Sequence, residues 1–202
     1  MKLVNMEYPW SLTQSEAPAV EPVSVADMKL HLKQDSSHDD GLITDLIVSA
    51  RELIELTTRR SLVNATYILI LDSFPQEIRP PRSPLVSVTS VAYLDTDGNS
   101  QTASAATVYQ TDTSFLPGRI SLREGADWPD TQDAIQAVTV TFVAGHGAAA
   151  ANVPAALRQA LKILVAHWYG TARELGAAGT IFTKLPWAYE SLIAPYSLAG
   201  SA

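Results

Sequence analysis

The spacing of the hydrophobic residues changes twice along this chain. Apolar side chains recur at helical spacing between residues 42 and 54 and again between 157 and 168. In the stretch from 137 to 143 they instead alternate with threonines, which is the pattern of a half-buried strand. The two patterns together predict an α+β fold. We expect a helical bundle from the N- and C-terminal helices, with an inserted antiparallel β-sheet or small sandwich.

Local signals divide the chain into three expected parts. Residues 1–23 contain three prolines and little periodicity, and they are interpreted as an extended N-terminal arm. Residues 24–170 form the core, with helices over 24–33, 40–60 and 153–170 and a β-insertion over 65–145. Residues 171–202 are interpreted as a flexible Gly/Ala-rich stretch followed by a C-terminal tail.

Polar residues are expected to begin the helices and to turn the strands. Ser24 is predicted to cap the first helix, with Asp27 three residues later. Asp39 or Asp40 should cap the second helix, and Asn152 the third. Strands are predicted over 67–71, 85–94, 108–110, 119–122 and 137–143. Asp97-Gly98-Asn99 is a turn signal that should return the second of these strands as a hairpin.

Composition limits the functions open to the chain. Its formal net charge of -7 disfavours a nucleic-acid-binding protein, because phosphate binding needs clustered Lys and Arg. The absence of cysteine excludes disulfides, Cys-ligated metals and thiol catalysis. No stretch of about 18 apolar residues is present, so no membrane span is expected. Residues 1–10 lack a basic region followed by an apolar run, and no secretory signal is expected.

Few residues form a pattern that could carry catalysis or bind a metal. His38-Asp39-Asp40 is the nearest approach to a metal cluster, but three adjacent residues chelate poorly, and a helix start explains them better. His146 stands between two glycines, where a turn is favoured over an oxyanion loop. His167 is interpreted as a packed or interface residue. We therefore expect no catalytic residue, no cofactor and no metal, and the chain is not expected to be an enzyme.

One acidic turn is similar in sequence to the beginning of a calcium-binding loop. Asp95, Asp97 and Asn99 have the spacing of the first ligands of such a loop. The later Glu that completes a calcium site is missing at the required spacing. A hairpin turn is therefore the favoured interpretation of these residues.

Several short motifs follow one another along the chain, namely residues 19–32, 39–43 and 57–60, then Pro81-Arg82-Ser83-Pro84 with the strand after it, Pro117-Gly118-Arg119-Ile120, 138–147, 153–160 and 167–169. In their order, these motifs resemble those of phage head–tail connector (adaptor) proteins of long-tailed phages and gene transfer agents. The resemblance spans roughly residues 19–196. Each motif is short, and their common order and spacing make the pattern specific.

The resemblance implies a structural role in the neck of a virion. It implies a homo-oligomeric ring of about a dozen copies that joins the portal protein to a stopper or tail-terminator protein. DNA would pass through the ring without specific binding, and no membrane would be involved. The subunit would be made in the cytoplasm of the bacterial host. Two alternatives remain open: another neck ring, such as a stopper or tail-completion protein, or a small hydrolase that uses His146 or His38.

The C-terminal tail is the candidate for contact with the portal. It is unusually apolar for a chain end, and chain ends are loose unless something holds them. Large aromatic side chains dominate interface hot spots. The alternative is that the tail folds back onto its own helices. The residues predicted to make the contact are Trp187, Tyr189, Leu192, Ile193 and Tyr196.

Overall fold

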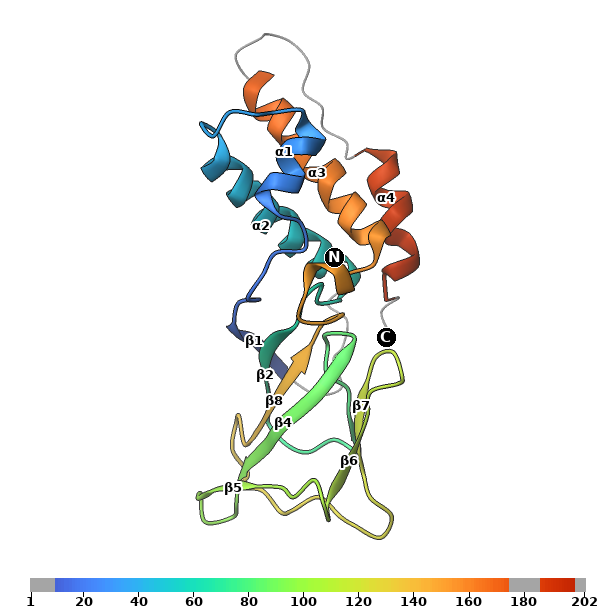
Figure 1. The fold of residues 1–202 in the computed structure, drawn as a ribbon. Helices are drawn as coiled ribbons and strands as arrows, with labels where there is room; N and C mark the ends of the chain where they lie inside the picture. The colour runs from blue at the N-terminus through green and yellow to red at the C-terminus, as the bar shows by residue number, and fades with distance from the viewer. Residues whose placement is uncertain (1–9, 175–185, 199–202) are drawn as a thin grey trace, which may run out of the picture. The chain divides into compact units, whose positions relative to one another are not determined.

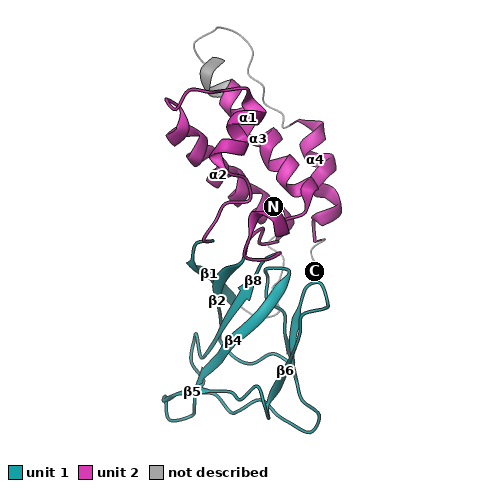
Figure 2. Cartoon of the chain, viewed as in Figure 1, with its two compact units in different colours: residues 1–18, 64–145, 199–202 teal, residues 19–63, 146–198 magenta. Residues whose placement is uncertain are grey.

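The protein is represented by a computed structural model that describes residues 10–174 and 186–198 (Figure 1). The chain forms two compact units, coloured separately in Figure 2. Among the described residues, 10–18 and 64–145 form the β unit, and 19–63, 146–174 and 186–198 form the helical unit. Within the described residues the chain crosses between the units three times, after Pro18, Val63 and Gly145. Helices and antiparallel sheets occur in one chain, which confirms the predicted α+β class.

The described part of the β unit contains a five-stranded sheet in the order β1-β2-β8-β4-β5, in which all neighbours are antiparallel. Strands β4 and β8 lie side by side in Figure 1, with β-bulges near Ser87 and Ser90 of β4. The alternating burial of β2 and β8 places every second side chain in the core. The strands of this sheet are β1 (Trp10–Glu16), β2 (Ala65–Leu71), β4 (Leu85–Leu94), β5 (Ser100–Thr102) and β8 (Val138–Ala144).

A second, three-stranded sheet in the order β3-β7-β6 shares its core with the first. Its strands are β3 (Glu77–Ile78), β6 (Tyr109–Asp112) and β7 (Arg119–Leu122). Each of them contributes one buried residue, namely Ile78, Tyr109 and Ile120, to the cluster that contains Phe142 and Val140 of β8. Burial of such side chains contributes about 1.5–3 kcal/mol each, which makes this core the main source of stability in the unit.

Each of the five predicted strands overlaps an observed one, namely β2, β4, β6, β7 and β8. Strands β4 and β7 have the predicted bounds, and the turn after β4 leads into β5 as a hairpin. Residues 10–16, which were expected to belong to an extended arm, form the edge strand β1 paired with β2. Only Leu12 of β1 is partly buried, so the strand carries almost no hydrophobic signal.

The described residues of the helical unit form four α-helices around one core. These are α1 (Val25–Leu32), α2 (Asp40–Thr58), α3 (Ala155–Glu174) and α4 (Trp187–Ile193). Two 3-10 helices, η1 (Ala150–Asn152) and η2 (Ala194–Tyr196), precede α3 and follow α4. Residues from all four α-helices form a single buried cluster. None of the described helices is long and apolar enough to cross a membrane.

The ends of the helices show which capping predictions were correct. Ser24 caps α1, and its Oγ accepts a hydrogen bond from the Asp27 backbone N–H at 3.0 Å. Asn152 does not cap α3, because its side-chain oxygen accepts from the Ala149 N–H instead. Helix α3 begins after Pro154, whose carbonyl accepts from the third and fourth residues that follow it. The helix runs past Gly170 to Glu174, since one glycine inside a helix costs only about 1 kcal/mol.

Candidate interaction surface and buried polar network

The residues weighed as a metal cluster, and interpreted as a helix start, make different structural contacts. Asp39 is the N-cap residue of α2, but its carboxylate makes no capping bond and instead accepts from the Tyr169 hydroxyl at 2.6 Å. Asp40 forms an ion pair with Lys29 at 2.8 Å. His38 is exposed. Among the described residues, no group of three His, Cys, Asp or Glu side chains could hold a metal ion.

The other residues weighed as catalytic also have structural surroundings. Burial lowers the pKa of His146, and the positive charge of Arg60 lowers this pKa further. The Nε2 atom of His146 is buried and has no hydrogen-bond partner among the described residues. His167 lies half-buried in α3.

The acidic turn is a hairpin, as predicted. One carboxylate oxygen of Asp95 accepts from the backbone N–H groups of Asp97 at 3.1 Å and Asn99 at 2.9 Å. Its other oxygen accepts from the Gln101 side chain at 3.0 Å. The hydrogen bond from Gln101 and those from the turn lower the pKa of Asp95. Gly98 has φ +81°, a conformation that glycine adopts without strain.

The C-terminal segment packs against the rest of the helical unit and also presents an exposed face. Tyr189 and Ile193 of α4 are buried in the helical core, and burial raises the pKa of Tyr189. Leu192 and Tyr196 are partly buried against the same core. Trp187 is 81% exposed and is the largest apolar side chain that this segment offers to a partner. The Gly/Ala-rich residues 175–185 lie outside the described residues.

The end of this segment is anchored by an arginine from the residues after α2. The Arg60 Nε donates to the Tyr196 carbonyl at 2.7 Å, and its guanidinium lies 5.7 Å from the centre of the Tyr196 ring. The Leu198 N–H donates to the Thr58 carbonyl at 3.3 Å. Burial lowers the pKa of Arg60. Helix α4 is therefore held at both its apolar face and its C-terminal end.

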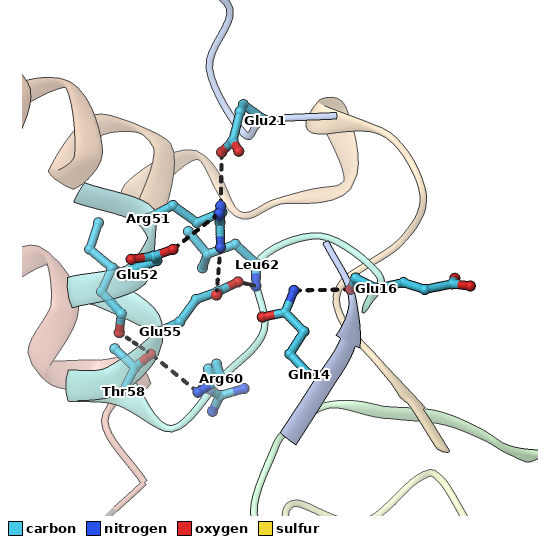
Figure 3. A network of polar contacts seen from close by, with 10 residues as sticks. Gln14, Glu16, Glu21, Arg51, Glu52, Glu55, Thr58, Arg60 and Leu62 are labelled. Carbon is cyan, nitrogen blue, oxygen red and sulfur yellow. Dashed lines mark hydrogen bonds and ion pairs between the residues drawn. The ribbon is translucent and has the colours of Figure 1, made fainter. Parts of the chain in front are cut away.

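A buried polar network in the same unit was not predicted from the sequence (Figure 3). Arg51 is 4% exposed, and its guanidinium contacts Glu21 at 2.9 Å and Glu55 at 3.1 Å. The other oxygen of Glu55 accepts from the Leu62 backbone N–H at 2.7 Å. Burial lowers the pKa of Arg51, but the charges of Glu55 and Glu21 outweigh that effect, and the pKa is raised. Glu52 lies 3.8 Å from the same guanidinium and is exposed.

Comparison with protein families identifies the sequence pattern. Residues 22–117, just under half of the chain, match the family described as phage gp6-like head-tail connector protein. The resemblance to head-tail connectors is confirmed. The matched region includes α1, α2, most of the polar network and the strands from β2 to β6. No curated protein matches the chain.

Solved structures share the fold of this chain over almost its whole length. A chain from the "Neck of empty GTA particle computed with C6 symmetry" has a TM-score of 0.78 at 21% identity. A chain from the "Virion of native gene transfer agent (GTA) particle" has a TM-score of 0.77 at 22% identity. A third, from the "Neck of native GTA particle computed with C12 symmetry", has a TM-score of 0.74 at 22% identity. Each match covers 95% of this chain and 97% of the other.

Proposed function

We propose that this chain is a structural subunit of the neck of a tailed phage or a gene transfer agent. The observation that carries the proposal is the match of residues 22–117 to the head-tail connector family. The fold shared with chains of gene transfer agent particles supports it, because the likeness extends over both units. The subunit belongs to the virion and does not catalyse a reaction.

The proposed assembly is a closed ring of about a dozen copies. The ring joins the portal protein on one side to a stopper or tail-terminator protein on the other, and DNA passes through its centre. In each subunit, helices from both ends of the chain form a bundle that carries the β-sheets as an insertion. The order of the elements supports this arrangement, since β2 to β8 lie between α2 and α3 in the sequence. The subunit is made in the host cytoplasm before it joins the particle.

The portal contact in this proposal lies on the C-terminal segment. Trp187 carries most of the contact, because it is the most exposed of the predicted residues. Tyr189 and Ile193 hold the helix in place from its buried side. Leu192 and Tyr196 are partly buried and contribute at the edge of the surface. The buried face keeps the exposed face of α4 ordered before the partner arrives, which lowers the entropic cost of binding.

Assembly with the portal tests the proposed function. The purified chain is mixed with purified portal rings and imaged by electron microscopy. We expect an additional symmetric ring of density on one face of the portal. Portals that bind no copies, or that bind them without symmetry, would show that the chain is not a connector ring.

A single substitution tests the proposed contact surface. Trp187→Ala should weaken binding to the portal by about 2 kcal/mol, roughly thirtyfold in Kd, as expected for an aromatic hot spot. The matched control is Leu30→Ala, because Leu30 is 78% exposed on α1 and lies outside the proposed surface. Equal binding by the two variants in a pull-down titration would place the contact elsewhere and leave the ring proposal intact.

A further inference from the structure

The hydrogen bonds around Arg51 reach all three places where the described chain crosses between the units. Glu21 lies two residues beyond the start of the first helical-unit segment, Ala19, and Leu62 lies one residue before its end, Val63. His146 is the first residue of the second segment. Arg51 binds Glu21, Glu55 binds the Leu62 N–H, and the His146 N–H donates to the Leu62 carbonyl at 3.3 Å.

The central pair of this network depends on mutual contact. Arg51 and Glu55 are each 4% exposed. A buried charge that loses its partner is strongly destabilised, whereas an intact pair that is fully hydrogen-bonded is tolerated. The contacts of Glu55 on one side and Glu21 on the other therefore break together when the guanidinium is displaced. Segments that lie far apart in the sequence are joined through this one pair.

The residues beside the network are buried as well. Val23 is 3% exposed and Val63 is 1% exposed, and both belong to the core of the helical unit. Opening of either crossing segment would expose one of these valines to water. Their accessibility therefore reports separately on the first and second crossings.

We infer that Arg51 and Glu55 form a clamp that holds the crossing segments of the helical unit in fixed mutual positions, so that the segments open together. The clamp differs from an ordinary ion pair along α2. Such a pair, four residues apart on an exposed helix face, supports its own helix and reaches no other segment. The inference concerns the isolated chain and does not depend on ring formation.

Thiol labelling can measure the opening of each segment, because the natural chain contains no cysteine. Val23→Cys and Val63→Cys are introduced singly, each into the natural chain and into Glu55→Gln. Glutamine keeps the size of the side chain and removes the charge that Arg51 requires. Ala160→Cys, at a fully buried position of α3, serves as the reference for opening of the whole unit. The labelling reagent is a soluble aromatic disulfide.

The clamp predicts that Glu55→Gln speeds labelling about tenfold in both the Val23→Cys and the Val63→Cys proteins, with little change in the Ala160→Cys protein. Glu52→Gln is the matched control, since Glu52 is exposed beside the same guanidinium. It should leave all three rates unchanged. Faster labelling of Val63→Cys alone would show that the Glu55 contact stabilises only the nearby segment, and this would overturn the inference. Equal acceleration at all three sites would overturn it too, because that result reports global unfolding.

A second variant keeps the inference testable if Glu55→Gln does not fold. Glu21 is partly exposed and contacts Arg51 from outside α2, so Glu21→Gln should be tolerated. The clamp predicts faster labelling of Val63→Cys in this variant, although Glu21 and Val63 lie far apart in the sequence. Unchanged labelling of Val63→Cys in a folded Glu21→Gln protein would show that the two segments open independently.

Discussion

Gly118 stands where any larger residue would meet the core of the β unit. A Cβ atom at this position would lie 2.5 Å from the Cβ of Leu85 and 2.9 Å from its Cδ2. Leu85 is 3% exposed and belongs to the core cluster, so it has little room to move. The glycine of the Pro117-Gly118 motif is therefore explained by close packing against β4.

Substitution of this glycine should destabilise the β unit. Gly118→Ala is expected to lower the free energy of unfolding by about 1–3 kcal/mol, the usual cost of overpacking a core. Gly41→Ala is the control, because an added Cβ there meets nothing within 4 Å in α2. The control should be stabilised by about 0.5–1 kcal/mol, since alanine favours helix. Urea denaturation of both variants measures the difference, and similar stabilities would contradict the packing argument.

Helix α4 has only seven residues, and its stability comes from packing rather than from its own length. Its two faces meet different surroundings. Tyr189 is 2% exposed and Trp187 is 81% exposed. Truncation of these two aromatic residues should therefore have different effects on the same short element.

Tyr189→Ala is expected to lower the free energy of unfolding by about 3–5 kcal/mol, because it leaves a large cavity in the helical core. Trp187→Ala should change stability by no more than about 0.5 kcal/mol. Thermal unfolding followed by circular dichroism compares the two variants. A large loss of stability in Trp187→Ala would mean that the exposed face of α4 is not free for a partner.

Elements with strong local signals could be predicted from the sequence, and those that depend on distant partners could not. Ser24 and the strand over 85–94 carry their own signals in capping and β-branching. Strand β1 is nearly all exposed and forms because β2 offers it a pairing edge. Helix α4 is short, and its buried contacts with the helical core, which a local pattern does not reveal, hold it in helical form.

The polar network escaped prediction for a related reason. Arg51 lies on an amphipathic helix where a charged residue is normally assigned to the solvent side. Its burial depends on Glu21, thirty residues earlier in the chain, which no local pattern connects to it. The spacing of Arg51 and Glu55, four residues apart, was the one available signal. That spacing usually marks an exposed ion pair, so it did not predict burial.

The acidic surplus of the whole chain is concentrated in one unit. Residues 10–18 and 64–145 of the β unit contain ten Asp and Glu residues against four Lys and Arg. The helical unit, residues 19–63 and 146–198, contains ten against nine. Negative charge repels the phosphates of DNA. A ring built from this chain should therefore let DNA pass without holding it.

The corresponding prediction is that the purified protein does not bind duplex DNA. Fluorescence anisotropy with a labelled duplex should show no binding at protein concentrations on the order of 10 µM in physiological salt, where nonspecific DNA-binding proteins are commonly bound. A basic DNA-binding protein in the same buffer is the control. Tight binding that weakens as salt is added would contradict the proposed passive channel.

The order of the two units along the chain determines which of them can fold first during synthesis. Every described residue of the β unit has left the ribosome once the chain extends some distance past Gly145. The helical core cannot close until α3 and α4 follow, because it unites residues from both ends of the chain. Since domains generally fold as units during synthesis, the sheets can form while α1 and α2 still lack their partners. The newborn chain thus exposes the apolar faces of α1 and α2 until α3 and α4 have emerged, and this interval is when it is most exposed to aggregation.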